Sequence, residues 1–217
     1  MGIPSKQTRA RSKAAKEKQF LNIIDAGRKL FLNYGPEGMS MRMLAKEIGM
    51  GKKSASSLYT YVKSKRELWF AIIRHDFRDF ERRMVEIYQN HSGTTKKLLI
   101  KIAALYFNFA EEDRQRYKMM FQTPAPISKQ VGPIEKEYES RTVFMLKYMV
   151  TQAVKQGEFK EQDVGKLSYF LWGILHGPIT VIDTELFGTK QKLPDIGSEN
   201  EFYNFMLGYM EKIMDIL

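Results

Sequence analysis

Residues 46–68, KEIGMGKKSASSLYTYVKSKREL, gather side chains that are well suited to contact with a polyanion. Small, hydroxylated residues fit a DNA major groove about 12 Å wide better than bulky apolar ones do. The lysines around them can contact phosphates, which adds affinity but little sequence information. Hydroxyl groups that can donate to or accept from base edges or phosphates occur at five positions: Ser56, Ser57, Tyr59, Thr60 and Tyr61. This combination predicts a DNA-binding surface.

The formal charge of +10 lies in the first third of the chain. Residues 1–80 hold 17 lysines and arginines against 7 acidic residues, whereas residues 81–217 hold 18 of each. Such segregation favours a polyanion-binding module joined to a neutral body. A solvated basic face without a partner would give the same charge count, so the charge alone leaves that alternative open.

Several other classes of protein are disfavoured. The chain has no cysteine, which excludes disulfides, thiolate nucleophiles and cysteine metal sites and fits a reducing, cytoplasmic compartment. The basic N-terminus lacks the apolar stretch of a secretory signal, and the most apolar run, LWGILHGPITVI, is too short to span a membrane. We therefore expect neither secretion nor membrane insertion.

An enzyme is not expected either. The three histidines, His75, His91 and His176, are far apart and show no metal-ligand spacing, and no glycine-rich phosphate loop is present. His75 and the adjacent Asp76 fall on a predicted helix, where neighbouring side chains point apart. No metal or cofactor is predicted.

The elements that would position the hydroxylated stretch are short helices. Apolar residues from Phe20 onward have helical spacing, and the NYGPEG sequence from Asn33 should stop that helix. Ser40 is a plausible N-cap for a second helix that Gly49 ends. Ser64 and Glu67 form a capping-box signature, which opens a long helix over residues 65–89. Two short helices joined by a glycine-containing turn are typical of a helix-turn-helix, whose second helix enters the major groove.

The rest of the chain also has helical patterns. Helices are predicted over 94–110, 113–121, 134–156, 163–186 and 199–217, with loops at 123–133 and 187–198. The predicted fold class is all-α, with about nine helices: an N-terminal three-helix module followed by a helical bundle. We expect a flexible basic arm over 1–17, a helix-turn-helix DNA-binding domain over 18–64, and a ligand-binding and dimerisation domain over 65–217.

The segments IIDAGRKLFLNYGPEGMSMRMLAKEIGM and LYTYVKSKREL carry a family resemblance. Over residues 20–70 the chain resembles the N-terminal domain of TetR-family transcriptional regulators, whose pattern includes I-x-x-A-x-x-L-F-x-x-x-G and L-Y-x-Y-F-x-[SN]-K-x-x-L. The resemblance implies that Ser40 and Arg42 touch phosphate, that the third helix contacts bases, and that Tyr61 and Lys65 grip the backbone. The DNA-binding residues expected are Ser40, Arg42, Lys52, Lys53, Ser54, Ala55, Ser56, Ser57, Tyr59, Thr60, Tyr61 and Lys65.

The chain departs from the family pattern at three places. Met39 stands where the family has threonine, which removes one expected phosphate contact, and Val62 replaces a phenylalanine. Three extra residues, 51–53, precede Ser54. They either lengthen the turn, which the helix-breaking glycine and the capping serine favour, or start the recognition helix about three residues earlier.

The resemblance also implies a homodimer and an effector pocket in the C-terminal half. YKMMFQTPAP and WGILHG are similar to the Tyr-x-x-Met-Phe and Trp-x-x-x-His-Gly features of one C-terminal subclass. The expected dimer helices, about 163–187 and 199–217, would space two recognition helices about 34 Å apart. A monomeric core could use the same apolar stripes.

A small apolar or aromatic effector is one interpretation of the aromatic residues in this half. Ordinary core packing is the other interpretation and is favoured for any single residue, and for His176 a hydrogen-bonded core histidine is favoured over a ligand contact. The candidate ligand-binding residues are Phe107, Phe121, Tyr148, Trp172, His176 and Asp183.

The expected function is a ligand-responsive regulator that represses transcription as a homodimer on a palindromic operator. The alternative is an architectural or constitutive DNA-binding protein without an effector. The basic arm could enter an adjacent minor groove or serve only as a solubilising tail.

Overall fold

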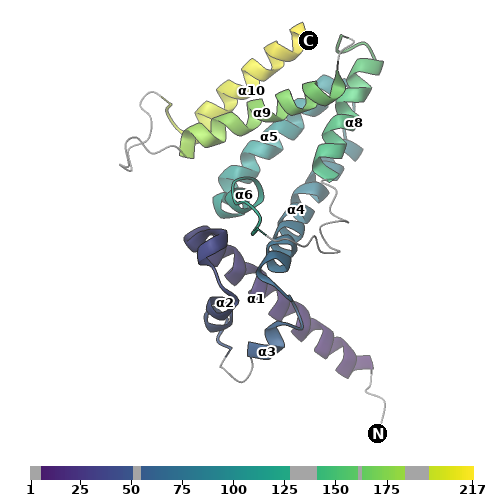
Figure 1. Ribbon diagram of the computed structural model, residues 1–217. Helices are drawn as coiled ribbons and strands as arrows, with labels where there is room; N and C mark the ends of the chain where they lie inside the picture. The colour runs from purple at the N-terminus through teal and green to yellow at the C-terminus, as the bar shows by residue number, and fades with distance from the viewer. Residues whose placement is uncertain (1–5, 51–54, 128–140, 161–162, 184–195) are drawn as a thin grey trace. The chain divides into compact units, whose positions relative to one another are not determined.

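The computed structural model describes residues 6–50, 55–127, 141–160, 163–183 and 196–217, and these residues form nine α-helices and no strand (Figure 1). The all-α prediction is confirmed. The helices are α1 Lys6–Gly38, α2 Met41–Glu47, α3 Ala55–Leu58, α4 Lys65–Gln89, α5 Thr95–Glu112, α6 Arg114–Phe121, α8 Arg141–Lys155, α9 Val164–Asp183 and α10 Glu199–Ile216.

The helices belong to two compact units. Unit 1 comprises Met1–Arg78 and Gln115–Tyr138, and unit 2 comprises Asp79–Arg114 and Glu139–Leu217. Helices α4 and α6 therefore each contribute residues to both units. The predicted division of the chain into functional domains at residues 64 and 65 stays a prediction.

The start of the chain differs from the expected flexible arm. Helix α1 begins at Lys6, so residues 6–17 belong to a helix. Their lysines, arginines, alanines, glutamine and glutamate all have high helix propensity, and extending an existing helix needs no new nucleus. The other end follows the prediction, because Gly35 leaves helical geometry with φ of 67° and Pro36 begins the short turn that follows.

The core of unit 1 joins α1, α2 and α4. Helices α1 and α4 approach closely at Gly27, where an added Cβ would lie 3.0 Å from a methyl of Ile72 and 3.1 Å from Leu68. A larger residue at position 27 would therefore force the two helices apart. The apolar residues almost completely buried around this contact are Ile23, Ile24, Phe31, Leu44, Leu68 and Ile72.

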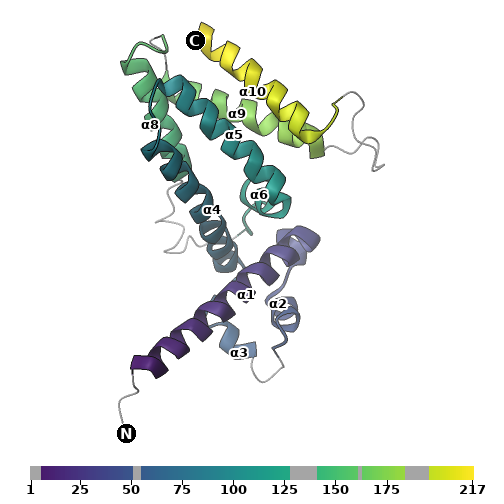
Figure 2. The ribbon, with the colours of Figure 1, turned by 180° about the vertical axis from the view of Figure 1, so that it is seen from behind.

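Helix α5 organises unit 2, since it packs against α8, α9 and α10 (Figure 2). Phe107 of α5 stacks on Tyr203 of α10 with ring centroids 4.5 Å apart. The first turn of α5 is held by Glu158, whose carboxylate accepts the N–H groups of Thr95 and Lys96 at 2.9 and 2.8 Å. This contact satisfies donors that a helix leaves open at its N-terminus.

Candidate nucleic-acid interface and ligand site

Helix α2 is capped at both ends. The Ser40 hydroxyl accepts the N–H of Met43 at 3.3 Å. At the other end the Met50 N–H donates to the Ala45 carbonyl at 2.8 Å, and the Gly49 N–H donates to the next carbonyl at 3.1 Å. This pair of bonds is a Schellman motif, which requires the left-handed φ of 70° at Gly49. The glycine predicted to end the helix thus makes the turn of the helix-turn-helix.

Helix α3 and the turn after it present the predicted hydroxyl groups. Leu58 and Val62 are each 1% exposed and fix this segment to the core of unit 1. The Thr60 hydroxyl donates to the Ser57 carbonyl at 2.7 Å, so it stabilises the end of α3 while its oxygen lone pairs stay available as acceptors. The exposed hydroxylated residues are Ser56, Ser57, Tyr59 and Thr60. Their contact with bases stays a prediction.

Part of the predicted interface lies outside the described residues. This part comprises Gly51, Lys52, Lys53 and Ser54, so the choice between a longer turn and an earlier helix start stays open. Ala55 is the first residue of α3.

The predicted phosphate-contacting residues have different surroundings. Arg42 is exposed at the start of α2, and Tyr61 is half-buried. Lys65, at the start of α4, has its ammonium 4.0 Å from the Glu37 carboxylate. Met39 is 2% exposed, so this residue belongs to the core and does not face DNA. An apolar side chain at this position adds packing where the family pattern has a hydroxyl.

The capping box predicted before α4 is only half formed. The Ser64 hydroxyl accepts the Glu67 N–H at 3.0 Å, as expected. The Glu67 carboxylate accepts the N–H of Lys63 at 2.7 Å, although a capping box would use the N–H of Ser64. The cap still satisfies two backbone donors at the start of the long helix.

An ion-pair cluster in unit 1 centres on the Asp76 carboxylate, whose side chain is 0% exposed. Arg28 of α1 donates to it from Nε at 2.9 Å and from Nη2 at 2.5 Å. Arg116 of α6 donates to the Asp76 backbone carbonyl at 3.0 Å, with its Nε 3.6 Å from Oδ1. His75 Nδ1 lies 3.2 Å from the same oxygen. The cluster joins three helices, and it brings together the side chains of His75 and Asp76, which were expected to point apart.

A second polar cluster lies in unit 2 around the Tyr106 hydroxyl. Trp172 Nε1 lies 3.3 Å from this oxygen and His176 Nδ1 lies 2.9 Å from it. An indole N–H only donates, so the tyrosine oxygen accepts it and donates its own proton to the imidazole. Burial lowers the pKa of His176, in agreement with a neutral ring that accepts at Nδ1. Trp172 and His176 were both predicted to bind a ligand, whereas Tyr106 was not among the predicted residues.

The other candidate ligand-binding residues lie in different surroundings. Phe107 is buried in its stack with Tyr203, and Tyr148 packs beside Tyr88 with ring centroids 6.1 Å apart. Asp183 lies 3.4 Å from the Arg114 guanidinium. Phe121 belongs to unit 1, where it packs edge-on against Phe77. A ligand-binding role for these residues stays a prediction.

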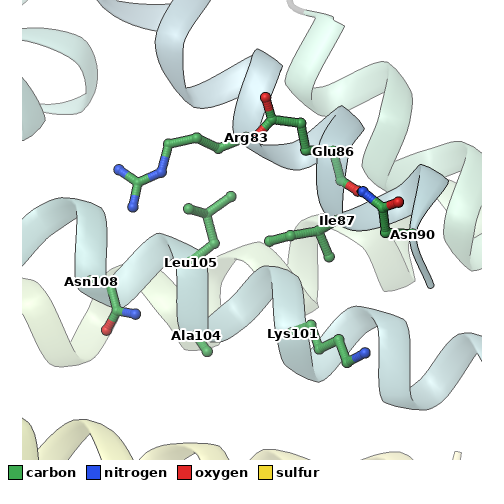
Figure 3. A pocket seen from close by; sticks show the side chains of 8 residues that line it. All are labelled: Arg83, Glu86, Ile87, Asn90, Lys101, Ala104, Leu105 and Asn108. Atoms are coloured by element: carbon green, nitrogen blue, oxygen red, sulfur yellow. The ribbon is translucent and has the colours of Figure 1, made fainter.

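An open groove of about 590 Å³ lies between α4 and α5 in unit 2 (Figure 3). Ile87 and Leu105 point toward each other from the two helices, and Ala104 of α5 also lines the groove. Charged and amide side chains line the rest of the groove: Arg83, Glu86, Asn90, Lys101 and Asn108. Arg83 is fixed by two bonds to Glu112, at 2.7 and 3.0 Å. The spacing of the α5 residues predicted a helix. It could not predict which neighbouring helix these residues face.

In the part of the chain that the structure describes, every helix is too short or too polar to span a membrane. The same residues contain no group of three or more histidine, aspartate or glutamate side chains that could hold a metal ion.

The capped α2, the glycine turn and the exposed α3 within an all-α chain define a helix-turn-helix protein with a helical second unit. Residues 23–72 match the family described as bacterial regulatory proteins, tetR family, and residues 99–199 match the tetracyclin repressor-like C-terminal domain. The two matches together span more than two thirds of the chain. The chain belongs to the tetR family of bacterial regulatory proteins.

Solved structures show the same fold at low sequence identity. FadR from Bacillus subtilis, in complex with stearoyl-CoA, has 18% identity and a TM-score of 0.69, with 91% of this chain and 100% of FadR covered. AibR, in complex with isovaleryl coenzyme A and operator DNA, has 16% identity and a TM-score of 0.66, covering 88% and 96%. PfmR from Thermus thermophilus has 19% identity and a TM-score of 0.63, covering 90% and 95%. A comparison with curated proteins found no match.

Proposed function

We propose that this protein represses transcription as a homodimer on a palindromic operator, and that an effector bound to unit 2 releases the DNA. The observation that carries the proposal is the helix-turn-helix itself, in which a rigidly capped α2 and buried Leu58 and Val62 present the hydroxyls of α3 to solvent. Two copies would read two half-sites about one DNA turn apart.

Selection of bound fragments from genomic DNA tests this proposal. The expected result is enrichment of one palindromic sequence, whose binding a metabolite extract weakens. Enrichment without any effect of the extract would support the architectural alternative. Binding without enrichment of any sequence would contradict the proposal.

An exposed apolar face on α9 and α10 supports dimerisation. Phe205 and Tyr209, one turn apart on α10, are 56% and 48% exposed with ring centroids 4.6 Å apart. On α9, Phe170 is 51% exposed, and Gly173 and Gly177 follow it at helical spacing with open space where a Cβ would stand. Small residues beside aromatic ones would let helices of a second copy approach closely. A second copy of the chain is therefore the occupant proposed for this face.

Replacing Tyr61 or Lys65 by alanine should weaken binding to every DNA sequence. Lys65 carries a positive charge to its proposed phosphate, so its loss should also reduce the slope of log K against log salt by about 0.9, whereas loss of the neutral Tyr61 should leave the slope unchanged. Fluorescence anisotropy over a salt series measures both effects. Lys29→Ala is the matched control, because this exposed lysine is already paired with Glu47 at 2.7 Å. Unchanged affinity for operator and random DNA would contradict the assignment.

The effector is proposed to be a coenzyme A thioester. AibR and FadR, which share the fold, are described in complex with such compounds. The groove between α4 and α5 offers matching chemistry, because Ile87 and Leu105 provide apolar contacts while Lys101 can contact anionic groups. The groove also contains the acidic Glu86, which lies 2.7 Å from Arg82.

Lys101→Glu should raise the acyl-CoA concentration needed for half-release of the operator about tenfold, which corresponds to about 1.4 kcal/mol. The cause is repulsion between the new carboxylate and the ligand's phosphates. Release of labelled operator by acyl-CoAs of several chain lengths gives the measurement. Lys97→Glu is the control, since Lys97 is exposed on α5 but does not line the groove. If the two variants release the operator at equal acyl-CoA concentrations, the groove is excluded as the acyl-CoA binding site.

A further inference from the structure

A second pocket, of about 310 Å³, lies entirely within unit 1 between α1 and α4. Phe20 of α1 and Ala71 of α4 give it apolar walls, together with Tyr61 and Val62 from the segment before α4. The Tyr61 hydroxyl can donate a hydrogen bond to an occupant of the pocket.

Two arginines line this pocket without a carboxylate partner among the residues that the structure describes. Arg74 and Arg78 are exposed and lie one turn apart on the same side of α4. Among the described residues, neither has a hydrogen bond or an ion pair. Other arginines are paired: Arg28 with Asp76, Arg83 with Glu112, and Arg114 with Glu199. Like charges one helical turn apart repel, so the pair of free guanidinium groups favours an anion in the pocket.

The acid that also lines the pocket does not neutralise the arginines. The Glu67 carboxylate accepts the Lys63 N–H at 2.7 Å as part of the cap of α4. Arg74 lies seven residues further along, which is about 10 Å at 1.5 Å per residue. The charge that the pocket offers to a ligand is therefore positive.

We propose that Arg74 and Arg78 bind a phosphate group in this pocket, with the Tyr61 hydroxyl as a further donor. Guanidinium groups match phosphate oxygens in charge and in hydrogen-bond geometry. The phosphate belongs either to the operator backbone or to a soluble phosphate compound. His75 lines the same pocket and lies 3.2 Å from Asp76, so the bound phosphate lies next to the ion-pair cluster of unit 1.

The test compares R74Q/R78Q with R82Q. Arg82 is another exposed arginine of α4, but it is paired with Asp79 and Glu86 and does not line the pocket. Inorganic phosphate is titrated into DNA-free protein by isothermal titration calorimetry. Phosphate binding that is lost in R74Q/R78Q but retained in R82Q would support a soluble phosphate compound as the ligand. This arm does not depend on the proposed regulatory function.

The second arm uses duplex DNA and rests on the proposed DNA binding. A salt slope reduced by about 0.9 or more in R74Q/R78Q, but not in R82Q, would assign the pocket to a backbone phosphate. Thermal melting confirms that each variant is folded. If R74Q/R78Q matches the wild type in both arms, the phosphate site is overturned. If the protein binds no DNA at all, the proposed regulatory function is contradicted. The calorimetric titration would still show whether the pocket binds phosphate.

Discussion

Asp76→Asn should lower the free energy of unfolding by about 3–5 kcal/mol, because it leaves charged guanidinium groups without their buried partner. The Asp76 side chain is 0% exposed, and Arg28 and Arg116 contact it from α1 and α6. The amide keeps the size of the carboxylate but loses its charge and one acceptor oxygen. Urea denaturation followed by circular dichroism measures the change.

Asp25→Asn is the matched control for this prediction. Asp25 also binds Arg28 at 2.9 Å, but its side chain is 69% exposed. Exposed pairs contribute at most about 1 kcal/mol, so this variant should unfold close to the wild type. Comparable losses of unfolding free energy in the two variants would show that burial of Asp76 does not determine how much the ion-pair cluster stabilises the protein.

The same carboxylate should make stability depend on acid pH. Burial raises the pKa of Asp76, but its contacts with His75, Arg28 and Arg116 outweigh burial and hold the pKa below its ordinary value of 3.8. The folded protein thus binds fewer protons than the unfolded chain near this pH. The contribution is complete above about pH 5 and is lost as the pH falls through the folded pKa. In Asp76→Asn the acid limb of the stability profile should be shallower.

Phe205→Glu should dissociate the proposed dimer and reduce operator affinity about 100-fold or more, because each half-site would then bind independently. Phe205 is 56% exposed on α10, so the substitution removes little packing within one protomer. A charge on this face would be desolvated in the dimer without a partner. Sedimentation velocity gives the oligomeric state, and anisotropy gives the operator affinity.

Phe144→Glu provides the comparison for the dimer prediction. Phe144 is 70% exposed on α8, outside the proposed α9 and α10 face. This variant should remain dimeric and bind the operator as the wild type does. A Phe205→Glu protein that stays dimeric would show that the two copies meet elsewhere.

Local signals predicted the helices well. Ser64 and the apolar spacing after it predicted the start of α4, and Gly49 predicted the turn of the helix-turn-helix. Both signals depend on residues that are close together in sequence. The helix over residues 6–17 was not predicted from their polar composition, since a helix already nucleated downstream can extend through polar residues.

Contacts between distant segments could not be predicted. Arg28, Asp76 and Arg116 are separated by dozens of residues, and no local pattern indicates that they meet. Aromatic density likewise could not distinguish a pocket from a core. Phe107 stacks on Tyr203, whereas Trp172 and His176 meet at the Tyr106 hydroxyl. The partner of each side chain depends on how α5, α9 and α10 pack.

The division of the chain between the units has a practical consequence for dissection of the protein. Residues 115–138 cluster with the first 78 residues, although unit 2 supplies the sequence between them. A fragment ending at Arg78 would keep Arg28 and Asp76 but lose Arg116 and the Phe121 ring that packs on Phe77. Such a fragment should be poorly stable, and proteolysis should not release a DNA-binding module as one uninterrupted peptide.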